Sequence, residues 1–298
     1  CYMDKAERIG IRVCDLMNEE VFVKKVRENV KIKNAIIEKI YGGEGVDAEE
    51  IINDYLGYAK RLKKYTADTT AILYNEIKAG KKVLFEGAQG AMLDIDSGTY
   101  PYVSSGASGS YGAASGAGVG PKSLDKIYGV FKAYETRVGN GPMPTEFNSE
   151  TESELCNYVR NTGNEFGVTT GRPRRCGYLD LVALRYACHV NSIDQLVLTH
   201  LDIYDDMDEI EACVAYDING RIVTDFPANI PDLNAAKPVL EKFTGWKQSI
   251  KECTSYSKLP KNAKKYVEFI EAFTGTPVGI VSVGADRNQT FVREKIWR

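Results

Sequence analysis

The chain has 298 residues, of which 43% are hydrophobic and 27% are charged, as in a typical globular protein with a large core. Lys and Arg number 38 against 41 Asp and Glu, and the net charge of -3 argues against a protein that binds nucleic acid chiefly through its phosphates. No segment approaches the roughly 18 uncharged apolar residues of a membrane span, which argues against a membrane protein.

Residues 15–80 predict a helical subregion. Apolar residues recur at helical spacing over residues 21–40, and the pattern stops at a Gly-Gly pair. Asp47 opens a second helix, and a third is expected over residues 69–79.

Four later segments predict strands. Residues 81–87, KKVLFEG, form a short apolar run between a Lys pair and a Gly, as in a buried strand. Residues 124–139 predict a strand that ends at a glycine turn. Residues 195–202 and 277–284 predict buried parallel strands, each of which ends in polar or Gly residues.

Helices and a hairpin separate these strands. Helices are expected near 151–160 and 178–190, and residues 261–275 predict an amphipathic helix with a Gly stop. Residues 209–223 predict a β-hairpin with an Asn-Gly turn. The alternation of strands and helices favours an α/β fold with a mostly parallel central sheet flanked by helices, in a single domain over residues 1–298.

The cysteines and histidines indicate neither a disulfide framework nor a metal centre. The seven cysteines are an odd number without a CxxC pair, which favours reduced thiols in the cytoplasm. With only His189 and His200 in the chain, a metal site built on several histidines is not expected.

A long Gly-, Ser- and Ala-rich segment, residues 86–120, is the strongest candidate for a ligand loop. Its opening EGAQG follows a predicted strand, where open α/β sheets bind ligands. Backbone N–H groups of glycines can approach an anion closely, and the amide of Gln89 suits a nucleobase edge or a ribose. A Gly-rich connector with one polar side chain remains the alternative. Within the segment, Asp94 and Asp96 could serve a metal or a base, although a structural role in a turn is simpler.

A second candidate is NTGNEFGVTTGRPRRCGYLD, residues 161–180. Three arginines, Arg172, Arg174 and Arg175, follow a Thr-Thr-Gly turn. Because the guanidinium fork binds a carboxylate or a phosphate through two hydrogen bonds, the cluster predicts an anion site. A solvated basic turn is the alternative.

Two strand ends complete the set of candidates. Asp202 closes THLD, and a carboxylate there can accept two N–H bonds from guanine; a cap for the next turn is the alternative. In SVGADR, residues 282–287, backbone N–H groups could hold a purine carbonyl oxygen, or the segment is an ordinary turn.

Four segments, in this order, closely resemble the adenylosuccinate synthetase family: VLFEGAQGAMLDIDSGTYPYV, FKAYETRVGNGPMPTE, NEFGVTTGRPRR and THLD. The resemblance runs over residues 1–298 and implies a P-loop-NTPase-like α/β fold. It also implies that the N-terminal part of the family's chain, which carries the phosphate loop, the catalytic Asp and His and the Mg²⁺ ligands, is missing. We therefore expect no catalytic or metal-binding residue in this chain, and no activity from the chain alone.

The resemblance implies a GTP-dependent ligase of AMP biosynthesis. It would join IMP and L-aspartate into adenylosuccinate through a 6-phosphoryl-IMP intermediate, with Mg²⁺ as cofactor. The resemblance further implies a cytoplasmic homodimer. The alternative is a non-catalytic fragment that binds nucleotide or dimerises.

The resemblance also assigns the binding residues. Those for IMP are Arg8, Gln89, Ser104, Val138 and Arg172. Of these, Arg8 would reach the partner subunit's site. Those for aspartate are Val168, Thr169, Thr170, Gly171, Arg172 and Arg174. Those for GTP are Arg174, His200, Leu201, Asp202, Ser282, Val283 and Gly284.

Three positions depart from the family's pattern. His200 stands where the family usually has Lys, and it keeps a donor and a flat ring but not a fixed charge. The run VSSGASGS around Ser104 replaces a TSSN-type run. Pro173 stands where Arg is common, while the pair Arg172 and Arg174 is retained.

Overall fold

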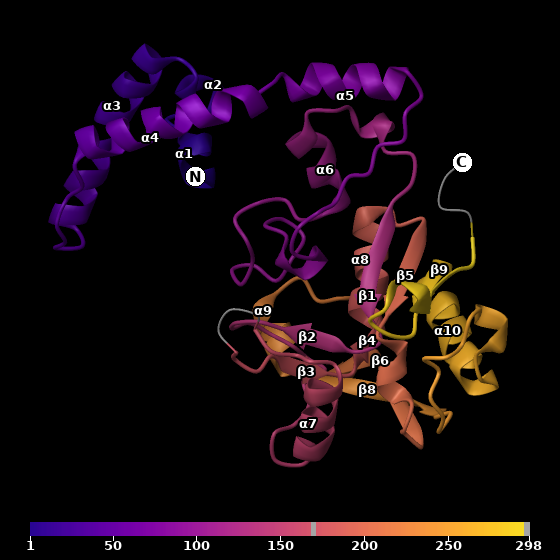
Figure 1. Cartoon of the computed structure of the whole chain (residues 1–298). Coiled ribbons are helices and arrows are strands. Elements are labelled where there is room, and N and C mark those ends of the chain that lie inside the picture. The colour runs from indigo at the N-terminus through magenta and orange to yellow at the C-terminus, as the bar shows by residue number, and fades with distance from the viewer. Residues whose placement is uncertain (168–170, 295–298) are drawn as a thin grey trace. The chain divides into compact units, whose positions relative to one another are not determined.

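The computed structural model describes residues 1–167 and 171–294 (Figure 1). The chain divides into two compact units, Cys1–Val83 and Leu84–Arg298. The expectation of one domain over residues 1–298 stays a prediction, since the compactness of each unit does not decide whether the two fold together.

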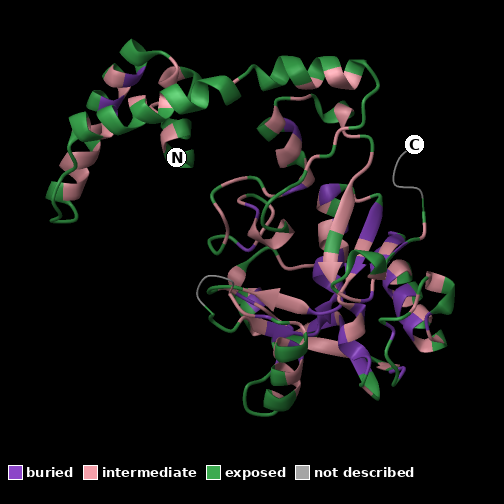
Figure 2. Cartoon of the chain, viewed as in Figure 1, coloured by how far each residue is buried: buried purple, intermediate pink, exposed green. Residues whose placement is uncertain are grey.

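The first unit is helical, as the sequence predicts. Its elements are α1 (Tyr2–Glu7), α2 (Val13–Leu16), α3 (Glu19–Lys39), α4 (Ala48–Leu62), the 3₁₀ turn η1 (Lys63–Tyr65) and α5 (Thr69–Lys78). The side chains of Asn18, Asp47 and Asp68 accept backbone N–H groups and so fix the starts of α3, α4 and α5. The buried core of this unit is small, and Figure 2 shows its helices largely exposed or half-buried.

A four-stranded sheet forms the centre of the second unit. Its order is β1 (Tyr128–Lys132), β5 (Gln195–Thr199), β9 (Val278–Ser282) and β10 (Thr290–Val292). β1 and β9 both pair with β5 in parallel, whereas β10 is antiparallel to β9. The two predicted buried parallel strands are thus confirmed, and the structure shows that they are neighbours.

Two smaller sheets lie in the same unit. β2 (Glu135–Arg137) pairs with β3 (Arg175–Gly177), and β4 (Leu179–Asp180), β6 (Glu209–Ile218), β7 (Arg221–Val223) and β8 (Ala236–Thr244) form the other. Asn219 and Gly220 both have positive φ between β6 and β7, which confirms the predicted hairpin and its turn.

Helices and short turns connect these strands. The helices are α6 (Ser110–Ala117), α7 (Ser153–Thr162), α8 (Leu181–Asn191), α9 (Ile230–Ala235) and α10 (Lys261–Thr274). The 3₁₀ turns are η2 (Ala91–Leu93), η3 (Pro121–Ser123), η4 (Leu201–Tyr204), η5 (Tyr256–Lys258) and η6 (Arg287–Gln289). Tyr266 and Ile270 on one face of α10 are fully buried, and Gly275 ends the helix in the left-handed conformation, as predicted.

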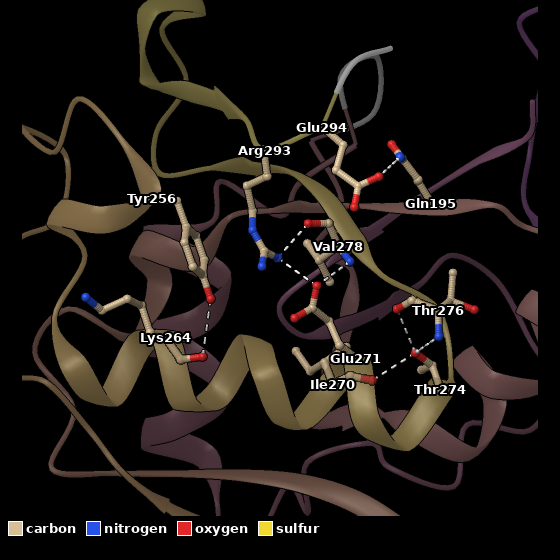
Figure 3. Close-up of polar contacts among 10 residues, drawn as sticks. All are labelled: Gln195, Tyr256, Lys264, Ile270, Glu271, Thr274, Thr276, Val278, Arg293 and Glu294. Carbon is tan, nitrogen blue, oxygen red and sulfur yellow. Dashed lines mark hydrogen bonds and ion pairs between the residues drawn. The ribbon is translucent and has the colours of Figure 1, made fainter. Parts of the chain in front are cut away.

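The segment after β10 is fastened to α10 and β9. Nη1 of Arg293 donates to Glu271 Oε1 and to the carbonyl of Val278, both at 2.7 Å (Figure 3). The guanidinium of Arg293 also lies over the ring of Tyr256, 4.0 Å from its centroid. These contacts lie at the start of β9, at the opposite end of this strand from Ser282.

Two strand predictions need correction. Residues 81–87 form no strand, and the Leu84 side chain is 77% exposed, because no described strand lies beside this segment to accept its backbone hydrogen bonds. The single strand expected over residues 124–139 is two strands, β1 and β2, in different sheets. The buried pair Ala133 and Tyr134 separates them.

Candidate functional site

The carboxyl ends of β1, β5 and β9 lie at one edge of the central sheet. Lys132 is in register with Thr199, and Leu198 is in register with Val281. The structure therefore places the two predicted guanine segments at the carboxyl ends of neighbouring parallel strands: His200–Asp202 directly follows β5, and Ser282–Gly284 begins with the last residue of β9. This is the edge at which open α/β sheets bind ligands.

The backbone turns sharply at His200. Its φ is 57°, in the left-handed region, and the next residue, Leu201, is fully buried. The imidazole packs edge-to-face on Tyr134, with ring centroids 5.7 Å apart. Burial and the nearby Lys132 charge lower the pKa of His200, so the ring is neutral at pH 7.

Asp202 is held by a lysine that sequence reasoning missed. Lys251 Nζ lies 3.5 Å from Asp202 Oδ2, as an ion pair beside the predicted base site. No sequence motif links Lys251 to Asp202, because the two residues lie far apart along the chain. Only the fold brings the two side chains together.

The turn after β9 is braced by Gln289. Ser282 Oγ donates to the Gly284 carbonyl at 2.9 Å, and the Val283 N–H donates to the Gln289 carbonyl at 2.9 Å. Gln289 Nε2 in turn donates to the carbonyl of Lys251 at 3.3 Å. The turn Ser282–Gly284 is thereby linked to the segment that carries Lys251.

A buried carboxylate, Glu165, connects this edge to the arginine-rich loop. Its side chain is 1% exposed and accepts hydrogen bonds from Lys132 Nζ at 2.5 Å, Tyr134 OH at 2.6 Å and Arg174 Nη1 at 2.7 Å. We call Lys132, Tyr134, Glu165 and Arg174 the Glu165 cluster. Burial alone would raise the pKa of Glu165, but the hydrogen bonds from Lys132 and Tyr134 outweigh it. The net shift of its pKa is downward, so Glu165 is ionised at neutral pH.

The three predicted arginines do not act as one cluster. Arg175 points elsewhere: it pairs with Glu146 and donates to the carbonyls of Gly139 and Gly141 at 3.2 and 2.9 Å. Arg172 is exposed. Arg174 belongs to the Glu165 cluster, and its buried Nε has no hydrogen-bond partner among the described residues.

The loop that carries Arg172 folds back on itself. The N–H of Gly167 donates to the Arg172 carbonyl at 2.8 Å, and Phe166 forms a bridge with Pro173. Gly171 has a φ of 63°, which suits a glycine at the turn. The predicted aspartate residues Val168, Thr169 and Thr170 lie outside the described residues.

Asp94 organises the Gly-rich segment. Its buried carboxylate accepts the backbone N–H groups of Asp96, Ser97, Ser108 and Gly109 at distances of 2.6–3.0 Å. The structural turn role of this residue is thus confirmed. The segment has a defined conformation because one carboxylate satisfies four backbone donors.

Arg137 connects two parts of the predicted IMP site, the Gly-rich segment and the turn that follows β2. Its Nη2 donates to Thr99 Oγ1 at 3.1 Å and to the Tyr102 carbonyl at 3.0 Å. This ties the Gly-rich segment to the turn that carries Val138, whose side chain is 74% exposed. The hydroxyl of Ser104 donates to the carbonyl of Leu93 at 2.9 Å, so it is already engaged within the segment.

Gln89 and Arg8 stand apart from these contacts. Gln89 is exposed with a φ of 63°, and the contacts of the described residues do not place it beside Arg172 or Asp202. Arg8 ends α1 in the first unit, also in the left-handed conformation, and is exposed. The roles of both residues toward IMP stay predictions.

The described residues offer no obvious place for a metal ion or a membrane span. Residues 1–167 and 171–294 contain no group of three or more His, Cys, Asp or Glu that could hold a metal. None of the helices in these ranges is long and apolar enough to cross a bilayer.

A sequence model of the adenylosuccinate synthetase family matches residues 1–291. The chain belongs to this family. It is 50% identical over 292 residues to the adenylosuccinate synthetase of Caldanaerobacter subterraneus, and 47% identical over 297 residues to that of Brachyspira hyodysenteriae. These matches cover 98% and 100% of this chain but 67% and 69% of the relatives.

A solved structure supports the same assignment. The fully ligated adenylosuccinate synthetase of Plasmodium falciparum superposes with a TM-score of 0.90 at 38% identity, over 99% of this chain and 68% of that one. The mixed α/β fold with a parallel-rich sheet is thereby confirmed. Lys132, Tyr134 and Glu165 lie inside the quoted family motifs, but the resemblance assigned them no role; the fold assembles them beside Arg174.

Proposed function

We propose that this chain takes part in the GTP-dependent joining of IMP and L-aspartate to adenylosuccinate, through 6-phosphoryl-IMP, as a step of AMP biosynthesis. One observation carries the proposal in a chain of this family. The segment that ends with Asp202 and the segment that begins with Ser282 lie at the same edge of the central sheet, and Glu165 anchors Arg174 to that edge.

The guanine of GTP would bind at the ends of β5 and β9. The Asp202 carboxylate accepts two hydrogen bonds, which matches the N1–H and 2-amino donors of guanine and mismatches adenine. His200 and Leu201 would form one wall and Ser282, Val283 and Gly284 the other. Lys251 would keep the Asp202 carboxylate turned toward the base.

Aspartate would bind at the loop over residues 168–174, with Arg172 and Arg174 as its cationic partners. A guanidinium binds a carboxylate through two parallel hydrogen bonds. The unpartnered buried Nε of Arg174 supports this role, because an unpaired buried donor costs about 1–3 kcal/mol until a ligand satisfies it.

IMP would contact Gln89, Ser104, Val138 and Arg172 of one subunit. Arg8 would come from the partner in a homodimer. GTP would carry Mg²⁺ on its phosphates, but the described residues supply no site for the ion, so we derive no step through it. We further propose a cytoplasmic enzyme in which residues 1–298 form one α/β domain with a helical subregion over residues 15–80.

The test is adenylosuccinate formation by a full-length synthetase that contains this sequence, beside isothermal titration of the 298-residue chain with IMP, GTP and aspartate. We expect turnover that requires all three substrates, and ligand binding without turnover for the chain alone. A full-length protein that binds nucleotide yet forms no adenylosuccinate would overturn the proposal in favour of a non-catalytic module.

A further inference from the structure

Glu165 links two parts of the chain that have different proposed ligands. Lys132 is the last residue of β1 and Tyr134 lies just after it, at the edge of the base site, whereas Arg174 belongs to the aspartate loop. The carboxylate is 1% exposed and ionised, and it is the shared acceptor for all three side chains. Removing its charge would leave two cations close together in a partly buried place, which is strongly unfavourable.

The contacts with Glu165 determine which edge of the Arg174 guanidinium stays available. The Arg174 N–H donates to the Glu165 carbonyl at 2.9 Å, so the two residues are also joined through their backbones. Among the described residues, Nη1 makes the one side-chain hydrogen bond of Arg174, to Glu165 Oε2. The edge formed by Nε and Nη2 is left, and it has the geometry to grip a carboxylate with two hydrogen bonds.

The same carboxylate supports the wall of the base site. The Tyr134 hydroxyl donates to Glu165, which fixes the ring that packs edge-to-face on His200. Lys132 Nζ lies 5.5 Å from the centroid of that ring and donates to Glu165 as well. Tyr134 and Lys132 therefore share one anchor with Arg174.

We propose that Glu165 is a positioning residue of the ligase reaction: it presents the Nε–Nη2 edge of Arg174 to the aspartate carboxylate while it holds Tyr134 against His200. The inference rests on the proposed function. It predicts a specific order of effects when Glu165 is replaced: the KM for aspartate rises most, the KM for GTP rises less, and the KM for IMP rises least.

The decisive experiment compares Glu165→Gln with Arg174→Ala and with the double variant in the full-length synthetase. We expect Glu165→Gln to raise the KM for aspartate about ten-fold, with a smaller rise in the KM for GTP and little change for IMP. Because Glu165 acts through Arg174, the double variant should use aspartate no worse than Arg174→Ala alone.

Glu271→Gln is the matched control. It also neutralises a partly buried carboxylate that pairs with an arginine, Arg293, but at the far end of β9 (Figure 3). We expect it to lower the melting temperature and to leave all three KM values unchanged. Should Glu165→Gln fail to fold, Tyr134→Phe removes one donor to Glu165 and keeps the ring on His200. It should raise the KM for aspartate a few-fold.

Three results would overturn the inference. The first is an unchanged KM for aspartate in Glu165→Gln, or in Tyr134→Phe when the former does not fold. The second is an additive loss in the double variant, and the third is an equal rise of all three KM values; the last two indicate a general structural role. Failure of the proposed function can be told apart from failure of this inference, because the unmodified full-length enzyme would then show no turnover.

Discussion

Arg174 and Glu165 are joined twice, by a backbone hydrogen bond of 2.9 Å from the Arg174 N–H and by a side-chain ion pair of 2.7 Å from Nη1. The double connection closes the arginine-rich loop at its base. Because Glu165 also binds Lys132, the base of the loop is fixed to the end of β1.

Replacing Arg174 by alanine should weaken the use of aspartate. Loss of a charge-assisted bidentate contact corresponds to roughly a 10- to 100-fold rise in the KM for aspartate. Steady-state kinetics of the full-length enzyme measures it, with Arg221→Ala, on the exposed strand β7, as the control. Aspartate kinetics identical to those of the unmodified enzyme would remove Arg174 from the aspartate site.

Replacing Asp202 by asparagine should change the choice of base. Asn offers one acceptor and one donor, so it matches xanthine, which has a carbonyl where guanine has its 2-amino group. We expect the KM for GTP to rise about ten-fold or more and the use of xanthosine triphosphate to improve. Asp225→Asn, whose side chain is 97% exposed, is the control. Full guanine selectivity in the Asp202 variant would contradict the assignment.

Replacing Lys251 by alanine should have a smaller effect. Its ion pair with Asp202 spans 3.5 Å and the lysine side chain is 50% exposed, so we expect a rise of at most about five-fold in the KM for GTP. Because salt screens such a pair, the difference from the unmodified enzyme should shrink as ionic strength increases. Lys247→Ala, which removes the ion pair of a similarly exposed lysine with Asp208, should leave the KM for GTP unaltered.

Replacing Asp94 by asparagine should destabilise the second unit in a pH-dependent way. An amide cannot accept all four backbone N–H groups, and we expect a loss of about 2–4 kcal/mol in the free energy of unfolding at pH 7. Chemical denaturation measures it, and Asp96→Asn, at an exposed position, is the control.

The pH dependence follows from the direction of the pKa shift. Burial raises the pKa of Asp94, but hydrogen bonds from Tyr111 and the backbone outweigh it, and the net shift is downward. A carboxyl group with a lowered pKa stabilises the fold above its unfolded-state pKa of about 4, and that contribution is lost as the pH falls through the folded-state pKa. The stability gap between the unmodified protein and Asp94→Asn should therefore narrow in acid. A gap that stays constant down to low pH would argue against this role.

Local patterns predicted the elements whose cause is local. The Asn219-Gly220 turn, the apolar face of α10 and the capped helices of the first unit all follow from residues within a few positions of one another. The strand expected at residues 81–87 failed because a strand also needs a neighbour, which an apolar run does not reveal. The motifs likewise indicated roles for Asp202 and Arg174 but none for Glu165 or Lys251, because Lys132 and Tyr134 reach Glu165, and Lys251 reaches Asp202, from distant parts of the chain.

The backbone conformation at His200 limits which residues can replace it. A φ of 57° is tolerated by Gly, Asn, Asp and His and is costly for β-branched side chains. Substitutions at position 200 are thus limited to unbranched or small residues, whichever nucleotide the protein binds. A change in nucleotide preference is more readily reached through positions such as 251, where the chain imposes no comparable conformational demand.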